Sequence, residues 1–204
     1  MNNKTPGILV VDNYDSFTYN IVQIIEEHGG CNFDVVKNDM VNIASAGRYD
    51  GFLFSPGPGL PEEAPLMADL LRLYHTKRSF LGICLGHQVI AETFGMKLIK
   101  LDTVRHGLMT TIRLIDPSDY IFKGMPYEFK AGLYHSWAVS VPFNFSETVS
   151  DLRVTALSDD GIIMAIAHKR YDIRGIQFHP ESYLSEHRHK IIHNWINNLS
   201  HRKM

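Results

Sequence analysis

The sequence lacks the features that mark secreted and membrane proteins. It has only two cysteines, Cys31 and Cys84, which is too few for a disulfide framework. No apolar run approaches the roughly 18 residues that a membrane-spanning helix needs. Residues 1–6 are polar and lack the basic-then-apolar layout of a signal peptide. We therefore expect a cytoplasmic protein that does not bind a membrane.

An excess of charge of one sign is also absent. The 20 lysines and arginines are balanced by 22 acidic residues, for a net charge of -2, so we expect no nucleic-acid partner. What is present is the composition of a globular protein, with 45% hydrophobic and 21% charged residues. A chain of 204 residues fits one domain, which we place over residues 1–204.

Short apolar segments alternate with helical patterns in the first half. Strands are expected at residues 8–11, 33–36, 52–54 and 80–83, and helices from Ser16 as N-cap to 28, from 65 to 74 and from 85 to 94. The second half is mostly strands, at residues 97–101, 109–115, 129–133, 153–157, 162–168 and 173–178, before a helix over 191–199. This order predicts a single α/β domain with a mostly parallel central sheet flanked by helices and a partly antiparallel second half.

Cys84 lies where an expected strand meets an expected helix, in the segment Gly82-Ile-Cys-Leu-Gly86. This is the glycine-flanked pattern of a sharp turn that presents a nucleophile. The N-terminus of the following helix favours negative charge and hence the thiolate, and the Leu85 backbone N–H could stabilise an oxyanion. A buried cysteine can also be a small apolar side chain. The two glycines favour the nucleophile for Cys84, whereas Cys31 lacks this context.

A cysteine nucleophile needs a base, and His179-Pro-Glu181 follows the expected strand at 173–178. Pro180 keeps His179 out of the helical region, and residues two apart in an extended chain share a side. The Glu181 carboxylate should therefore reach the imidazole. Among the other histidines, His87 is expected to pack or shape the turn, and His189 and His193 to lie on a solvated helix face rather than bind a metal.

The segment Ser55-Pro-Gly-Pro-Gly59 also follows an expected strand. Ligands of parallel sheets bind at the carboxyl ends of strands, so this loop can reach the crevice that holds Cys84. Its glycines expose backbone N–H groups, and its prolines stiffen the loop. The alternative is a simple turn, since proline and glycine occur in many loops.

Together, Ser55-Pro-Gly-Pro-Gly59, Gly82-Ile-Cys-Leu-Gly-His-Gln88 and Phe178-His-Pro-Glu-Ser182 resemble the class I glutamine amidotransferases over about residues 7–200. The segments at 12–20 and 134–137 resemble those of the glutaminase subunits of chorismate-using synthases. The tryptophan-pathway enzyme anthranilate synthase is the first expectation, and the folate-pathway enzyme aminodeoxychorismate synthase is the alternative.

The resemblance implies that Cys84 attacks the side-chain amide of glutamine, while His179, oriented by Glu181, transfers protons. It further implies backbone oxyanion donors and positions that hold glutamine, which match Gly57, Leu85, Gly59, Gln88, Ser136 and Trp137. Residues 13–18 and 104–107 match regions that face the synthase. No cofactor or metal is implied in this chain, and Mg²⁺ is expected only on the synthase partner.

The sequence departs from the family at two positions: many members carry arginine at the position of Leu133 and leucine at that of Trp137. Two other classes of function stay open. One is a non-catalytic docking subunit, which the loss of Cys84, His179 or Glu181 would have favoured. The other is a free-standing hydrolase of glutamyl substrates, which would be fully active without a partner.

Overall fold

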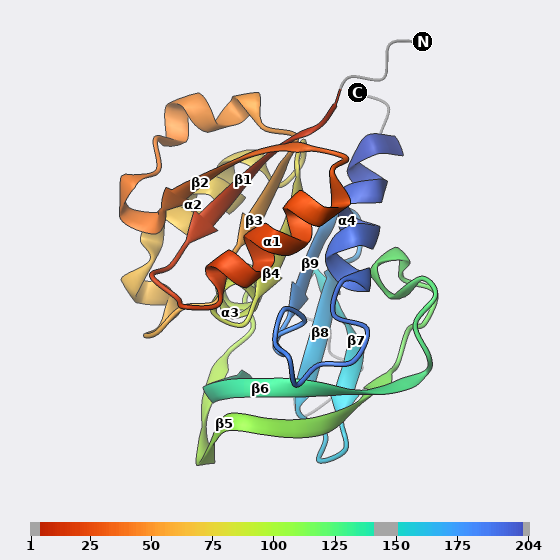
Figure 1. The fold of residues 1–204 in the computed structure, drawn as a ribbon. Helices are drawn as coiled ribbons and strands as arrows, with labels where there is room; N and C mark the ends of the chain where they lie inside the picture. The colour runs from red at the N-terminus through yellow and green to blue at the C-terminus, as the bar shows by residue number, and fades with distance from the viewer. Residues whose placement is uncertain (1–4, 141–150, 202–204) are drawn as a thin grey trace.

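The computed structural model describes residues 5–140 and 151–201. Within these residues one sheet of nine strands runs in the order β2-β1-β3-β4-β9-β8-β7-β5-β6 (Figure 1). The strands are β1 (Gly7–Asp12), β2 (Asn32–Lys37), β3 (Gly51–Phe54), β4 (Ser79–Ile83), β5 (Leu98–Leu114), β6 (Glu128–Val139), β7 (Leu152–Ser158), β8 (Ile163–His168) and β9 (Ile173–Ile176). The helices are α1 (Thr18–His28), α2 (Pro65–Tyr74), α3 (Leu85–Thr93) and α4 (Lys190–His201). Short 3₁₀ helices are η1 (Asn38–Met40), η2 (Ile43–Arg48), η3 (Pro61–Glu63) and η4 (Tyr120–Phe122).

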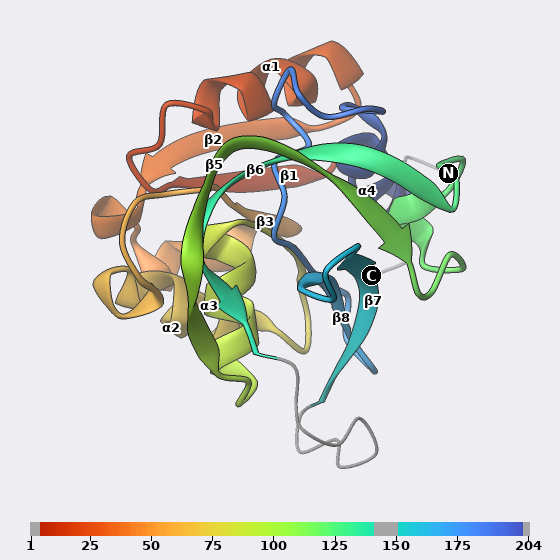
Figure 2. The same cartoon turned by 90° about the horizontal axis from the view of Figure 1, so that it is seen from below.

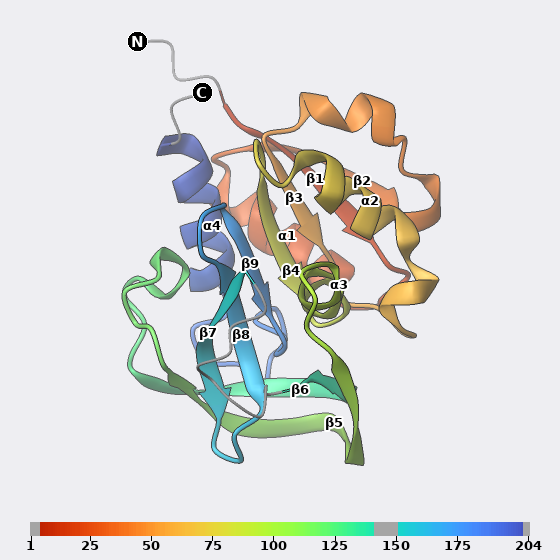
Figure 3. The same ribbon diagram turned by 180° about the vertical axis from the view of Figure 1, so that it is seen from behind.

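Strands β1, β2, β3, β4 and β9 are parallel and form the half of the sheet that is covered on both faces. Successive side chains of β1 point to opposite faces, as strand geometry requires. Ile8 and Val10 join the core under α1 and α4, whereas Leu9 and Val11 join the core under α2 and α3. Figure 3, seen from behind, shows α2 and α3 on the face opposite α1 and α4. Two-sided burial explains why β1 and β3 are apolar runs, whereas the edge strand β2 is only partly buried and carries Asp34.

The remaining strands are antiparallel, and they bend the sheet back toward its parallel half. β8 pairs with β9 and β7, and β5 pairs with β7 and β6. The long β5–β6 hairpin arches across the molecule (Figure 2). A bridge between Gly132 of β6 and His179 joins this hairpin to the chain that leaves β9. The hairpin thereby brings β6 to the loops that follow the parallel strands.

The expected fold class is confirmed, with two local corrections. The strands expected at 97–101 and 109–115 are one strand, β5, because β6 extends to Val139 and pairs along it through two register shifts. Ser16 is not the N-cap of the first helix, which begins at Thr18. The side chain of Asp15 accepts a hydrogen bond from the Phe17 N–H at 2.8 Å, and its backbone carbonyl accepts one from Thr18. The N-cap is Phe17, without a side-chain cap, and the Asp15 bonds stabilise the turn just before the helix.

Candidate active site

Cys84 occupies a strained turn between β4 and α3. Its φ of 52° and ψ of -102° are unusual for a residue with a side chain, and such a conformation costs about 1–3 kcal/mol. The flanking glycines make the turn possible. A Cβ on Gly82 would lie 2.4 Å from the Gly86 backbone, and one on Gly86 would lie 2.6 Å from the carbonyl oxygen of Phe54. The fold maintains this strain at the residue expected to be the nucleophile.

Gln177 is a site residue that the sequence analysis missed. Its side chain is buried, and its Nε2 lies 3.6 Å from the Cys84 Sγ as a hydrogen-bond donor. Its Oε1 accepts a hydrogen bond of 3.2 Å from Gln88 Nε2. The signal was present, because Gln177 and His179 are two apart just after β9, and residues two apart in an extended chain share one side. Beyond His179 the chain turns, since the Ser182 N–H donates to the His179 carbonyl at 3.2 Å, so a turn rather than the expected extended chain brings Glu181 to the imidazole.

The expected contact between His179 and Glu181 is present. The imidazole Nδ1 and the Glu181 Oε1 are 2.7 Å apart, and both side chains are buried. Burial acts to lower the pKa of His179, but the Glu181 carboxylate and the nearby Cys84 outweigh it and raise that pKa well above its usual value. The other nitrogen, Nε2, is buried and makes no hydrogen bond within the described residues. Contacts between a nucleophile and its base often tighten only on substrate binding.

Two aromatic rings hold the imidazole of His179. The ring of Tyr134, in β6, is 4.9 Å from it, and that of Phe17, just before α1, is 5.5 Å from it, both edge to face. Tyr134 and Phe17 also contact each other, with centroids 4.9 Å apart. His106 of β5 packs on Tyr134 at 5.2 Å. Phe17 and His106 come from the two segments expected to face a synthase, so both segments are joined to the imidazole by one ring cluster.

The loop 55–59 approaches Cys84 at Gly57. A Cβ at Gly57 would lie 2.5 Å from the Asn13 Cβ and 2.9 Å from the Leu85 Cδ2. Asn13 fixes this loop, because its backbone N–H donates to Ser55 Oγ at 2.9 Å and its Nδ2 donates to the Ser55 carbonyl at 2.8 Å. The Leu85 N–H heads α3, where the first N–H groups of a helix lack intrahelical partners. Gly57 is therefore packed closely against Leu85, the first residue of α3.

A cavity of about 280 Å³ opens at this point. Six of the nine site residues expected from the sequence line it, with four neighbours: Gly57, Pro58, Gly59, Leu60, Cys84, Gln88, Tyr134, His135, Ser136 and Trp137. Three expected residues, Leu85, His179 and Glu181, lie outside this lining. Cys84 is therefore the member of the expected catalytic set that a ligand in this cavity would contact.

The two departures from the family have different surroundings. Leu133 is buried in the core under α1 and α4, where an apolar side chain is favourable. Trp137 lines the cavity, and its backbone carbonyl accepts hydrogen bonds from Gln88 Nε2 at 2.9 Å and from His135 Nδ1 at 2.8 Å. Burial lowers the pKa of His135 to about 4, so this histidine is neutral. The Trp137 backbone is thus tied to α3 through Gln88.

The remaining histidines and Cys31 lie apart from this chemistry. His87 is fully buried, and burial lowers its pKa to about 3, so it packs as expected and is neutral. His193 corrects the expectation of a solvated face, because it contacts the Ile24 carbonyl at 3.3 Å and the His28 ring at 4.9 Å. His189 faces Glu27 at 3.4 Å. Burial raises the pKa of Cys31 to about 11, which keeps it a thiol.

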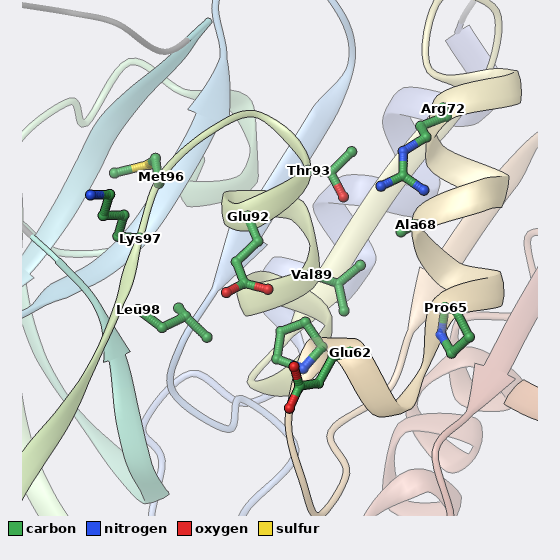
Figure 4. Close-up of a pocket in the computed structure, with 11 residues that line it drawn as sticks. Glu62, Pro65, Ala68, Arg72, Val89, Glu92, Thr93, Met96, Lys97 and Leu98 are labelled. Carbon is green, nitrogen blue, oxygen red and sulfur yellow. The ribbon is translucent and has the colours of Figure 1, made fainter.

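A larger hollow of about 610 Å³ lies between α2 and α3 (Figure 4). Its lining contains no cysteine or histidine, and its charged side chains, such as Glu92 and Arg72, stand on the outer surface of these helices. Size alone therefore does not identify the site.

Across residues 5–140 and 151–201, no group of three metal-binding side chains occurs, and no helix is long and apolar enough to cross a membrane.

Comparisons with known proteins agree with the geometry. The sequence model of the family "Glutamine amidotransferase class-I" matches residues 9–199. The chain is 39% identical to anthranilate synthase component 2 of Saccharolobus solfataricus over 198 residues, which cover 94% of this chain and 98% of that protein. It is 38% identical to aminodeoxychorismate synthase component 2 of Escherichia coli over 194 residues, covering 93% and 98%.

A solved structure of a glutamine amidotransferase from Thermotoga maritima has the same fold. Its TM-score is 0.77, with 98% of this chain and 100% of that chain covered, at 12% sequence identity. At this identity the likeness concerns the fold alone, whereas the family match spans nearly the whole sequence. The expectation drawn from the three motifs is confirmed: the chain belongs to the class I glutamine amidotransferases.

Proposed function

We propose that this protein is the glutaminase subunit of a chorismate-using synthase, and that Cys84, His179 and Glu181 are its catalytic residues. The observation that carries the proposal is a strained cysteine that lines the cavity, with a buried His179–Glu181 pair near its thiol. Nucleophile, base and orienting carboxylate are the three parts that a cysteine hydrolase needs. The domain that performs this chemistry spans residues 1–204.

In the first half of the reaction, the Cys84 thiolate attacks the side-chain carbonyl carbon of glutamine. The carbon–nitrogen bond then breaks, and the leaving nitrogen takes a proton from the imidazolium of His179 to depart as ammonia. The raised pKa of His179 suits this role, because the imidazolium must hold its proton until the leaving group needs it. The product on the enzyme is a glutamyl thioester on Cys84.

In the second half, a water molecule attacks the thioester carbon and gives a proton to the neutral imidazole of His179. The carbon–sulfur bond breaks, glutamate leaves, and the thiolate–imidazolium pair is restored. Glu181 does not exchange a proton in this scheme, because its hydrogen bond to Nδ1 only fixes the tautomer and stabilises the cation. The backbone N–H groups of Gly57 and Leu85 stabilise the oxyanion in both halves.

Glutamine is held by the cavity walls on the far side of Cys84. Gly59, Ser136 and Trp137 contribute backbone and hydroxyl groups there, and Gln88 fixes the Trp137 carbonyl. About 280 Å³ is enough for one amino acid of this size to lie with its side chain toward the thiol. No metal takes part in this chain, and Mg²⁺ belongs to the synthase.

The ammonia is consumed by a synthase subunit, so the working form is a heteromer. Anthranilate synthase is the first partner we propose, with aminodeoxychorismate synthase as the alternative, and relatives bearing both names support this pair. The docking surface includes the exposed side chains of Tyr14, Ser16 and Val104, whereas Asn13 and Thr18 are buried and hold the loop from inside. We place the complex in the cytoplasm.

Replacement of the thiol tests the proposal. Cys84→Ala and Cys84→Ser should abolish glutamine-dependent synthesis by the complex while free ammonia still supports it, because that chemistry lies in the partner. Cys31→Ala is the matched control and should keep glutamine-dependent synthesis. Retention of glutaminase activity by Cys84→Ala would show that the nucleophile is misassigned.

A further inference from the structure

Glu181 has a second carboxylate oxygen that its partner His179 does not use. Oε1 bonds the imidazole, but Oε2 is buried and has no hydrogen-bond partner among the described residues. An unpaired oxygen of a buried carboxylate is costly, and native proteins commonly satisfy such atoms with ordered water. The surroundings of Oε2 should therefore contain a polar site.

A small cavity of about 10 Å³ lies against Glu181, which does not line the larger cavity at Cys84. This volume is about that of one water molecule by the same measure, roughly 10–15 Å³. Its wall is one face of α1 together with the segment between β9 and α4, namely Asn20, Gln23, Ile24, Glu27, Tyr183, Arg188 and His189.

The spacing of the α1 residues shows that a single helix face turns toward Glu181. Asn20, Gln23, Ile24 and Glu27 follow the i, i+3, i+4, i+7 pattern. Phe17, three residues before Asn20, is on the same side and contacts the His179 ring. The beginning of α1 therefore lies along both members of the His179–Glu181 pair.

Most polar groups around this cavity already have partners. Gln23 Nε2 donates to Glu27 at 2.8 Å, and His189 faces the same carboxylate at 3.4 Å. The Arg188 guanidinium lies over the ring of Tyr183, which is 79% exposed. Among the polar α1 side chains at the cavity, only the amide of Asn20 makes no hydrogen bond to the described residues.

We propose that one water molecule occupies this cavity and bridges the side-chain amide of Asn20 to Glu181 Oε2, which makes Asn20 a positioning residue for the catalytic pair. The inference rests on the proposed function, in which Glu181 orients His179. Through the water, α1 fixes the plane of the carboxylate, and the carboxylate fixes the imidazole. Asn20 touches neither substrate nor thiol.

The test is glutaminase kinetics of Asn20 variants across pH, with folding followed by thermal melting. Asn20→Ala should lower kcat about 10-fold, the effect of one lost hydrogen bond to a charged group, and leave KM nearly unchanged. Asn20→Ser keeps a donor and should recover most of the rate. Asn20→Asp adds a second negative charge near His179, which raises the pKa of the imidazole further, so the alkaline limb of the profile should move to higher pH. Asn197→Asp is the matched control on α4 and should leave the limb in place.

Wild-type kcat in Asn20→Ala, or an equal loss at every pH in Asn20→Asp, would overturn the inference. A high-resolution crystal structure gives a second measurement that does not depend on activity. Water density within hydrogen-bond distance of both Asn20 and Glu181 Oε2 supports the bridge, and a cavity filled by a side chain refutes it. If the wild-type protein itself lacks glutaminase activity with its partner present, the proposed function fails, and this is distinct from an active enzyme indifferent to Asn20.

Discussion

The ring of Phe17 lies 5.5 Å from the ring of His179, although 161 positions separate the two residues in the chain. Phe17 ends the loop that begins at Asn13, and Asn13 in turn holds Ser55 and packs against Gly57. One short loop therefore contacts both the expected base and the expected oxyanion loop. A partner that docked on this loop, as we propose, would contact residues that themselves touch the expected base and the expected oxyanion loop.

Because Phe17 contacts the His179 ring, we expect substitutions of Tyr14 and Phe17, two aromatic residues of the same loop, to have different effects. Tyr14 is exposed and donates a hydrogen bond to Asp39 at 2.8 Å, away from His179. Tyr14→Asp should therefore weaken activation by the synthase and leave basal hydrolysis of glutamine unchanged. Phe17→Asp should lower both, because it replaces an apolar contact of the imidazole. Basal and activated glutaminase rates, measured for both variants, check this, and equal effects of the two substitutions would contradict it.

His179 and Glu181 should contribute unequally to turnover. His179→Ala should cost more than Glu181→Ala, because the histidine transfers protons whereas the carboxylate orients it. Steady-state kinetics of the two purified variants give the comparison. If both keep wild-type turnover, the catalytic assignment is wrong.

The pH dependence of the rate should report the contact between Glu181 and His179. The carboxylate raises the pKa of His179, so the imidazolium persists above its usual range and the alkaline limb of the pH–rate profile should lie high. Glu181→Gln removes the negative charge that stabilises the cation, and the alkaline limb should then move to lower pH. A limb that moves to higher pH, or stays in place, would contradict this account of the pair.

The close contact at Gly57 predicts a steric effect on the oxyanion loop. In Gly57→Ala the new methyl group would meet the Asn13 Cβ at 2.5 Å, so the loop must shift. Loss of one oxyanion donor costs about 2.7–4 kcal/mol, or roughly 100- to 1000-fold in kcat. Gly7→Ala is the control, because its nearest neighbour would be at 3.8 Å, an ordinary contact. A Gly57→Ala variant with wild-type kcat would mean that this loop does not stabilise the transition state.

The sequence predicted most of the parallel half of the fold, because buried strands and amphipathic helices have distinct periods. It predicted strand boundaries poorly in the antiparallel half, where the pairing between strands, rather than their amino-acid composition, determines which residues are extended. β5 is largely exposed and carries Asp102 and Arg105 in its middle, so composition did not indicate that residues 102–108 join the two expected strands. Pairing with β6 on both sides of a register shift makes them one strand. The prediction of Ser16 as the N-cap was wrong, because the helix begins two residues later, after a turn in which the Asp15 side chain accepts a hydrogen bond from the Phe17 N–H.

In the candidate site as well, features within one local segment were predictable, whereas contacts between distant segments were not. The strand-to-helix turn at Cys84 and the contact of His179 with Glu181 were predictable from local sequence patterns, and their catalytic roles stay a prediction. Gln177 lies two residues before His179 and could have been found. The contacts of Phe17 and Tyr134 with His179 could not, since they depend on how β6 and the loop before α1 meet in three dimensions.

The most direct test of the central claim is the rate of glutamate release by the isolated protein, and by the protein with a synthase subunit and chorismate. Ammonia in neutral water is mostly ammonium, a poor nucleophile, so a coupled glutaminase should hydrolyse glutamine mainly when its partner is docked. We predict a slow isolated chain, a rise of up to roughly 100- to 1000-fold with the loaded partner, and no release by Cys84→Ala in either state. The synthase that produces the rise, anthranilate or aminodeoxychorismate, identifies the pathway. A chain that runs at full rate alone and responds to neither synthase would contradict the subunit assignment and indicate a free-standing hydrolase.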